Sequence, residues 1–404
     1  MLKIIKNRYN SNSNSNSNSN NNSNRNKMSK LIDQGGFGCV FYPAIECDGR
    51  ISKNPKYISK LHKKDKHVVN EYNIGKMITR IPLYEYYYSP VVNMCNIDVA
   101  KIDKEERDMC RIVSKANADS KFVIMKMPFI KNINLIKYLT NPNIETKEIV
   151  TYILDSYTFL LNNLMILNAN KIIHYDLKIP NILIKEKTKT PIIIDFGLSI
   201  PISNLNTTTY SKYFYTYSPS YYIWPIDVHV ICYVLCINSV LTREALHELV
   251  DTYLTFNSAL KIFSESFIAK FKEVAIRVYS KYVNMSASDI VNELVKNCNT
   301  WDSYALSAMF LNIINFISQN GFTNNKLINE FSQLLLLNFH PDAKKRLSFD
   351  ETKKRYNGLF SLDDSIEGYE NILKNFDKKY FSEAALKETI HQEKITPVVM
   401  KKKV

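Results

Sequence analysis

The sequence predicts an α+β protein in which several short strands precede a long buried helix. Residues 34–41 contain three glycines before an apolar run and read as a strand, a glycine turn and a second strand. Residues 56–61 and 122–127 are further strand-like runs. Between residues 145 and 167, apolar side chains recur at helical spacing, which predicts a long helix with one face in a core.

The most informative stretch is a polar loop, flanked on both sides by short β-branched runs that read as strands. It carries Asp176, a lysine two residues later (Lys178) and an asparagine five residues later (Asn181). A carboxylate that accepts a hydroxyl proton, a cation that meets a moving phosphate and an amide oxygen that binds Mg²⁺ together suit phosphoryl transfer. Asp195 follows the next apolar run and offers a second metal-binding carboxylate.

The order and spacing of residues 174–181 and of Asp195, Phe196 and Gly197 closely resemble the catalytic and metal-binding loops of eukaryotic-type protein kinases. The resemblance implies a two-lobed fold, with a small β-rich N-lobe, a larger helical C-lobe and ATP bound between them. It also implies that Asp176 orients the substrate hydroxyl and accepts its proton, and that Lys178 neutralises the γ-phosphate. Asn181 and Asp195 would hold Mg²⁺.

A glycine-containing hairpin stands where such kinases have a lid over ATP. Glycines let main-chain N–H groups approach phosphates closely. Asp33 replaces the glycine that usually begins this loop and would bring a negative charge near the triphosphate. The residues expected to contact ATP here are Ile32, Asp33, Gln34, Gly35, Gly36, Phe37, Gly38, Cys39 and Val40.

Two lysines compete for the role of binding the α- and β-phosphates. Lys53 is followed closely by Pro55, which argues against an unbroken strand there, so Lys60 is the better candidate. Glu71 is the single acid on the helical segment that follows and would pair with Lys60.

Residues 122–127 resemble the strand that leads to the hinge between kinase lobes, where the main chain receives adenine. Met125 and Met127 are therefore expected at the adenine pocket. Core packing is the ordinary alternative for such a methionine.

The second half of the chain allows two alignments. In one, residues 218–220 stand for the kinase Ala-Pro-Glu motif and Asp227 begins the central buried helix. In the other, which we prefer, Asp227 is the acid of that motif and pairs with Arg346, while Asp302 begins the central helix. This alignment requires a long helical insertion over residues 228–300.

Composition and termini complete the expected organisation. Residues 1–27 are rich in Ser and Asn and too poor in apolar side chains to fold, so we expect disorder. The kinase-like domain covers residues 28–357, with the N-lobe at 28–127 and the C-lobe at 128–357. Residues 358–404 form a basic, solvated tail.

The seven cysteines are odd in number and scattered, which favours a reduced intracellular protein over a disulfide scaffold or zinc site. No signal peptide is visible, and the longest apolar stretch, near residues 230–241, is too short and polar to span a bilayer. These features predict a soluble cytoplasmic protein. The net charge of +14 fits acidic partners such as nucleotides, without a dedicated nucleic-acid site.

The function that these features predict is transfer of the γ-phosphate of Mg-ATP to a protein Ser or Thr, since Lys178 two residues after the base is the Ser/Thr-kinase form. Tyr175 replaces an arginine of many kinases, which makes activation by a phosphorylated loop docking there unlikely. Composition and compressed motifs are similar to those of serine/threonine kinases of large DNA viruses. The alternatives are a pseudokinase, which would bind ATP or protein without turnover, and a small-molecule kinase of related fold.

Overall fold

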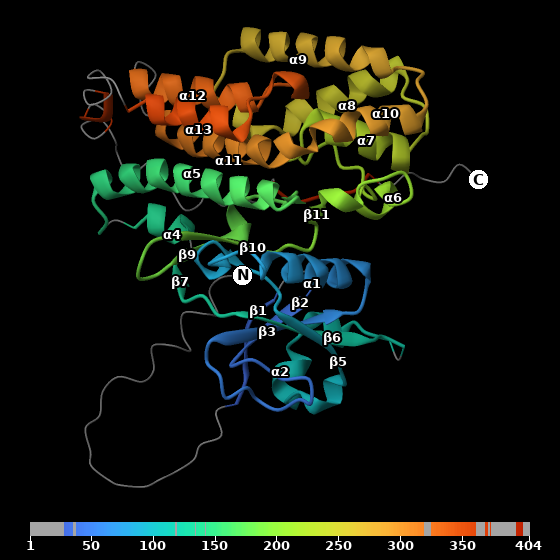
Figure 1. Cartoon of the computed structure of the whole chain (residues 1–404), viewed down its shortest axis with the longest axis vertical. Coiled ribbons are helices and arrows are strands. Elements are labelled where there is room, and N and C mark those ends of the chain that lie inside the picture. Colours follow the sequence, from blue (N-terminus) through green and yellow to red (C-terminus); the bar gives the residue numbers. More distant parts are fainter. Residues whose placement is uncertain are drawn as a thin grey trace. The chain divides into compact units, whose positions relative to one another are not determined.

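The computed structural model describes residues 28–34, 38–117, 119–133, 135–141, 143–318, 325–360, 368–370, 372 and 393–398. The chain divides into two compact units (Figure 1). The first unit combines the chain up to Thr79 with Ser89–Phe129, and the second combines Arg80–Tyr88 with the chain from Ile130 onward. The predicted disorder of residues 1–27 concerns a segment outside the described residues.

The first unit is built on a five-stranded antiparallel sheet with the order β1-β2-β3-β6-β5. The apolar side chains on one face of the sheet form a core with short helices of the 98–116 region. The elements of this unit are β1 (Lys30–Gln34), β2 (Gly38–Tyr42), β3 (Tyr57–Lys63), α1 (Lys66–Ile78), β5 (Asn93–Ile97), η3 (Val99–Lys101), α2 (Lys104–Asp108), α3 (Arg111–Ser114) and β6 (Phe122–Pro128). The predicted strands and the helix that follows β3 are all present.

Helix α1 begins where the sequence provides a capping acid. The Asp65 carboxylate accepts hydrogen bonds from the main-chain N–H groups of His67 and Val68, at 2.8 and 3.0 Å. These bonds satisfy donors that a helix otherwise leaves without partners at its N-terminus. One apolar face of α1 is buried through Val68, and Ile74 and Ile78 follow at helical spacing.

The cysteines of the first unit contradict the prediction of a fully reduced protein. Cys39 is disulfide-bonded to Cys110, and Cys47 is bonded to Cys95. The partners are 71 and 48 residues apart in the chain, and the folding of the unit brings them together. No short sequence motif indicates such pairings. The cysteine spacing therefore led to the wrong prediction of a reduced protein.

The second unit is mainly helical, with two small sheets of order β4-β10-β9-β7 and β11-β8. The strands are β4 (Tyr88–Ser89), β7 (Asn132–Ile133), β8 (Ile172–Ile173), β9 (Ile182–Lys185), β10 (Pro191–Ile194) and β11 (Ile200–Pro201). The α-helices are α4 (Leu135–Leu139), α5 (Thr146–Ala169), α6 (Tyr210–Tyr213), α7 (Ile226–Cys236), α8 (Arg243–Phe256), α9 (Glu265–Tyr279), α10 (Ala287–Leu294), α11 (Trp301–Ser318), α12 (Lys326–Asn338) and α13 (Phe349–Gly358). The 3-10 helices are η2 (Tyr84–Tyr86), η4 (Ile179–Asn181), η5 (Ile202–Asn204), η6 (Ser258–Leu260), η7 (Ser280–Tyr282), η8 (Val295–Thr300) and η10 (Ala343–Lys345).

Helix α5 is the predicted long helix, and it lies alongside α11 and α13 (Figure 1). Its stretch Lys147–Ala169 is long and apolar enough to cross a membrane by length and composition, but 56% of its most apolar window is buried inside the molecule. Burial of this extent is typical of a core helix. Between α7 and α11 the chain forms α8, α9 and α10, which is the predicted helical insertion. The α+β fold, β-rich in the first unit and helical in the second, is confirmed.

Candidate active site

The polar loop between β8 and η4 is held in place by a buried carboxylate at the start of α11. The Asp302 carboxylate accepts the main-chain N–H of His174 at 2.7 Å and that of Tyr175 at 2.9 Å. Burial raises the pKa of Asp302, while the His174 ring and these two N–H groups act in the opposite direction. The preferred alignment, in which Asp302 begins the central helix and holds this loop, is confirmed.

Asp176, Lys178 and Asn181 form one cluster around the carboxylate of Asp176, whose side chain is 11% exposed. The Lys178 Nζ lies 2.9 Å from Asp176 Oδ1. The Asn181 amide nitrogen donates to Asp176 Oδ2 at 3.0 Å and to the Asp176 carbonyl at 2.8 Å. The structure therefore brings the three predicted residues of this loop into direct contact.

Tyr221 is a further member of this cluster, and the sequence gave no sign of it. Its hydroxyl donates to Asp176 Oδ1 and lies 3.4 Å from the Lys178 Nζ. Burial, together with the charge of Asp176, raises the pKa of Tyr221 well above its usual value, so the hydroxyl stays protonated and can donate. Tyr221 is one of several tyrosines in a Ser/Thr/Tyr-rich run, and nothing in the local pattern distinguishes it from its neighbours.

Asn181 and Asp195 flank one end of the β9–β10 hairpin. Ile182 pairs with Ile193 across the antiparallel strands, so the residue before Ile182 and the residues just beyond Ile193 share this end. The backbone of Asp195 has a φ of 63°, a value that is uncommon for non-glycine residues and often found at functional sites.

The donor atoms at this hairpin end fit a magnesium ion. Asn181 uses its amide nitrogen toward Asp176, which leaves the amide oxygen as the group available to a cation. An amide oxygen and a carboxylate are the hard ligands that Mg²⁺ prefers, usually completed by water and substrate phosphates. Among the described residues, no group of three or more His, Cys, Asp and Glu side chains could form a closed metal cage.

Tyr175 is buried and cannot receive a phosphorylated loop in the present arrangement. Its ring is 3% exposed and stacks on Trp224, with 4.7 Å between the ring centroids. The Trp224 indole N–H donates to the Tyr175 carbonyl at 2.7 Å. This side chain therefore packs the catalytic loop against the segment before α7.

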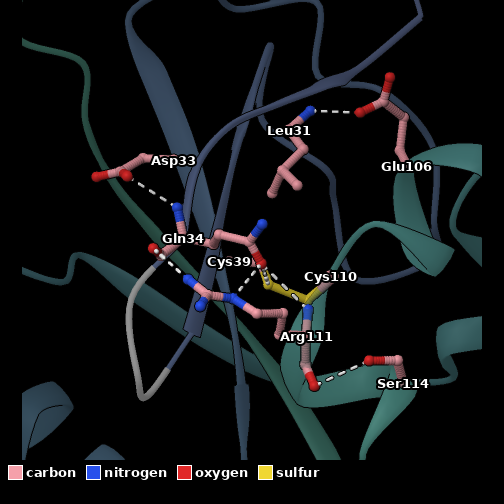
Figure 2. The surroundings of a disulfide bond; sticks show 8 residues. All are labelled: Leu31, Asp33, Gln34, Cys39, Glu106, Cys110, Arg111 and Ser114. Atoms are coloured by element: carbon pink, nitrogen blue, oxygen red, sulfur yellow. Dashed lines mark hydrogen bonds between the residues drawn. A yellow bond between two sulfur atoms is a disulfide. The ribbon is translucent and has the colours of Figure 1, made fainter. Parts of the chain in front are cut away.

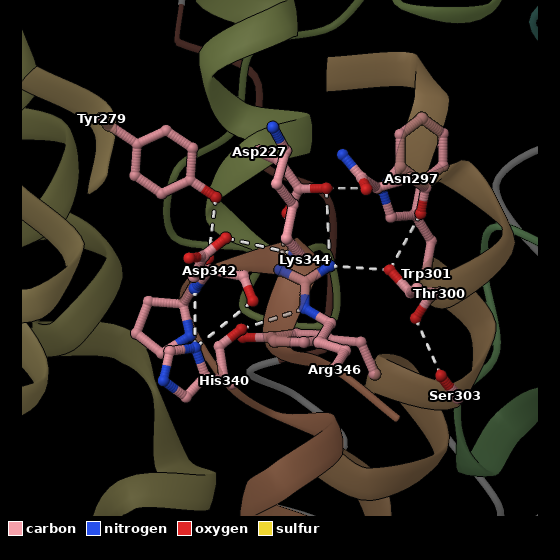
Figure 3. A network of polar contacts seen from close by, with 12 residues as sticks. Asp227, Tyr279, Asn297, Thr300, Trp301, Ser303, His340, Asp342, Lys344 and Arg346 are labelled. Atoms are coloured by element: carbon pink, nitrogen blue, oxygen red, sulfur yellow. Dashed lines mark hydrogen bonds and ion pairs between the residues drawn. The ribbon is translucent and has the colours of Figure 1, made fainter. Parts of the chain in front are cut away.

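A fully buried ion pair anchors the first turn of α7 to the turn after α12 (Figure 3). The Arg346 guanidinium lies 2.7 Å from Asp227, and both side chains are 0% exposed. Arg346 also donates to the His340 carbonyl and to the Thr300 hydroxyl, each at 3.0 Å, and the Trp301 indole donates to Asp227 at 2.6 Å. The predicted pairing of Asp227 with Arg346 is confirmed.

In the first unit, Lys60 on β3 pairs with Glu71 on α1. The Lys60 Nζ lies 3.5 Å from the Glu71 carboxylate, which is buried. Lys53 is exposed and lies outside the strands. The choice of Lys60 over Lys53 as the lysine that pairs with Glu71 is confirmed, whereas its contact with phosphate stays a prediction.

Met125 lies directly opposite Lys60 in the β3–β6 ladder. Its side chain is fully buried among Val68, Val91 and Val123, and Met127 packs against the same cluster. Both methionines therefore have the core-packing role that the sequence left open. Their contact with adenine stays a prediction.

The glycine-containing hairpin is described at both of its strands, while Gly35, Gly36 and Phe37 lie outside the described residues. Ile32, Asp33 and Gln34 belong to β1, and Gly38, Cys39 and Val40 belong to β2. A Cβ on Gly38 would come within 2.8 Å of the Leu61 carbonyl oxygen, so glycine is required there by the close approach of β3. Asp33 accepts the N–H of Gln34 through its carboxylate at 2.8 Å.

The 104–114 helices hold β1 at both of its ends (Figure 2). The Glu106 carboxylate accepts the N–H of Leu31 at 2.6 Å. The Gln34 side-chain oxygen accepts the main-chain N–H of Arg111 at 3.2 Å, next to the Cys39–Cys110 disulfide. The helices of residues 104–114 therefore support β1, the first strand of the hairpin.

The comparisons with known proteins agree with this geometry. Residues 27–225 match the family model described as the protein kinase domain. The match ends one residue before α7 begins. No curated protein is similar enough to be matched to the chain.

Proposed function

We propose that this protein, whose residues 27–225 match the protein kinase domain model, transfers the γ-phosphate of Mg-ATP to Ser or Thr hydroxyls of a protein substrate. The observation that carries the proposal is the contact of Lys178 and Asn181 with the Asp176 carboxylate. Phosphoryl transfer asks a protein mainly for positioning and charge neutralisation, and this cluster offers both.

Asp176 is the group that orients the substrate hydroxyl and accepts its proton. A general base must come within hydrogen-bond reach of the proton that it removes. The Asp176 carboxylate is fixed by Asn181 on one oxygen and by Lys178 on the other, so its direction is set before the substrate arrives. Lys178 then faces the transferred phosphate with its ammonium group.

In the first unit, Lys60, paired with Glu71, would bind the α- and β-phosphates, and the main chain near Met125 and Met127 would receive adenine. The hairpin of residues 32–40 would contact the phosphates. In the second unit, Asn181 and Asp195 would hold Mg²⁺, which would supply neutralisation of charge on the phosphate oxygens. Asp33 lowers the affinity for the triphosphate through its charge, compared with the glycine usual at this position.

Ser/Thr specificity rests on Lys178. The lysine stands two residues after the base and contacts the same carboxylate at 2.9 Å, in the arrangement typical of Ser/Thr kinases.

The test is transfer of radiolabelled phosphate from ATP to generic protein substrates, followed by phosphoamino-acid analysis. We expect labelled phosphoserine or phosphothreonine that depends on added Mg²⁺. Labelled phosphotyrosine alone would contradict the specificity. Binding of Mg-ATP without transfer to any substrate would favour the pseudokinase alternative.

A further inference from the structure

Residues 393–398, a described part of the C-terminal region, lie against the segment that precedes α7. The Ser218 hydroxyl donates to the Thr396 carbonyl at 2.8 Å and accepts the Thr396 N–H at 3.0 Å. The Val398 N–H donates to the Tyr217 carbonyl at 2.9 Å. The N–H groups of two alternate residues thus face the same segment, which is the pattern of an extended peptide.

Glu393 anchors this segment in the interior of the second unit. Its side chain is 1% exposed, so this part of the tail is not the solvated end that the sequence suggested. Its carboxylate accepts the Tyr222 hydroxyl at 3.3 Å, and Tyr222 is itself fixed by the Asn312 amide at 2.7 Å. Burial raises the pKa of Glu393 to about 7, although Lys178 and the Ile179 N–H favour its charged form.

Glu393 is connected to the catalytic cluster through two consecutive tyrosines. Tyr221 donates to the Asp176 carboxylate, and Tyr222 donates to Glu393. The charges of Lys178 and Asp176 both act on Glu393. Residues 393–398 therefore lie close to the loop that carries Asp176 and Lys178.

We propose that residues 393–398 are an autoinhibitory segment that competes with the protein substrate for the surface formed by Tyr217, Ser218 and Tyr222. The proposal rests on the proposed kinase function and adds its regulation. The competing substrate binds as an extended peptide and must displace the tail. The Tyr221 hydroxyl donates a hydrogen bond to Asp176 Oδ1, and the substrate hydroxyl has to replace it there.

The experiment compares full-length variants of the tail in steady-state kinetics with a protein substrate. Glu393→Ala removes the buried anchor, and Val398→Pro removes the N–H that Tyr217 accepts. Val398→Ala is the matched control, because it keeps this N–H and changes only a side chain that is 47% exposed.

We expect the KM for the protein substrate to fall about three- to tenfold in Glu393→Ala and Val398→Pro, in line with the loss of one or two hydrogen bonds. The control should keep the wild-type KM. The kcat at saturating substrate and the KM for ATP should stay unchanged in all variants, because the tail competes with protein and not with nucleotide. A synthetic peptide with the sequence of residues 390–401 should inhibit Glu393→Ala competitively against the protein substrate.

Equal KM values in the wild type and both variants would overturn the inhibitory role while leaving the kinase function intact. An equal fall in Val398→Ala and Val398→Pro would overturn the main-chain pairing as its cause. Hydrogen exchange of the Val398 amide gives a readout without catalysis, and it should be faster in Glu393→Ala. If neither the wild type nor any variant transfers phosphate, the proposed function fails and the inhibitory role fails with it, whatever the exchange shows.

Discussion

At the scale of individual residues, some side chains are proposed to act on the reaction and others hold them in place. Asp176 is positioned by Lys178 and Asn181, which come from the same short loop. Asp302 acts indirectly, because its carboxylate fixes the loop through the main-chain N–H groups of His174 and Tyr175. Among the contacts described, it touches none of the side chains of Asp176, Lys178 and Asn181. Loss of either kind of residue should reduce activity, but for different reasons.

The substitution Asp176→Asn should reduce phosphate transfer by roughly 10²–10⁴-fold, the usual effect of removing a general base. Mg-ATP binding should be retained, because Asn181, Asp195 and Lys60 remain. Turnover and nucleotide binding by titration calorimetry would measure the two effects. Asp251→Asn, which changes an exposed carboxylate on α8, is the control. Turnover near the wild-type value in Asp176→Asn would rule out its role as the base.

Lys60→Met should impair turnover far more than Lys53→Met, because Lys60 alone is paired with the buried Glu71. The KM for ATP in each variant is the measurement. A larger effect of Lys53→Met would show that the phosphate-binding lysine lies outside β3.

At the scale of helices and strands, one ion pair and two disulfides join parts of the chain that are far apart in sequence. The Asp227–Arg346 pair connects α7 to the turn after α12. One disulfide connects β2 to Cys110, the residue before α3, and the other connects the loop after β2 to β5. These links involve buried charges or covalent bonds, so their removal has effects larger than those of surface contacts.

Asp227→Ala and Arg346→Ala should each destabilise the second unit by about 3–5 kcal/mol, because each leaves an opposite charge buried without its partner. The double mutant should lose much less than the sum of the two, since removing both charges leaves neither uncompensated. Unfolding by urea gives the free energies. Additivity of the two single effects to within about 0.5 kcal/mol would mean that the ion pair contributes no coupling.

Loss of the Cys39–Cys110 disulfide should destabilise the first unit by about 2–5 kcal/mol, because the cross-link closes a long loop in the unfolded chain. Cys110→Ala should therefore lower the melting temperature of this unit. Cys236→Ala, at an exposed free cysteine, is the control and should have little effect. A melting temperature of Cys110→Ala equal to that of the control would show that the bond does not form in the protein.

At the scale of the whole molecule, Glu393 accepts a hydrogen bond from Tyr222, which lies 171 residues earlier in the chain. The groups that face Glu393 are Lys178, Asp176, Tyr222 and Tyr221. Under the proposed autoinhibition, docking of residues 393–398 would couple the protonation of Glu393 to access of the protein substrate.

The docking of the tail should weaken as the pH rises from about 5 to about 7. The pKa of Glu393 is about 7 when docked, against 4.5 for an unperturbed glutamate, so the docked state binds more protons in this window. The protonated Glu393 carboxyl stabilises the docked tail fully below pH 4.5, and this stabilisation is lost as the pH rises through about 7. Within this window the equilibrium constant for docking falls by at most about tenfold per pH unit. The KM for the protein substrate should accordingly fall with rising pH in the wild type relative to Glu393→Gln, which stays neutral. A constant ratio of the two KM values over this range would contradict the prediction.

The sequence by itself determined the elements whose signals are local. Asp176, Lys178 and Asn181 lie within six residues, and the strands and helix that carry Lys60 and Glu71 follow from apolar periodicity over short windows. Asp227, Arg346 and Asp302 were assigned by resemblance to a motif order, and the structure confirms their contacts.

Only the tertiary structure decided the two disulfides, the role of Tyr221 and the return of Glu393 to the catalytic loop. Each depends on a contact between residues that are far apart in sequence. A local sequence pattern cannot predict such a contact, because the fold of the intervening residues determines it. A buried carboxyl such as that of Glu393 looks in the sequence like any other charged residue of a polar tail. Its burial follows from the partners that the fold provides, because a carboxyl leaves water only where hydrogen bonds and charges offset the loss of hydration.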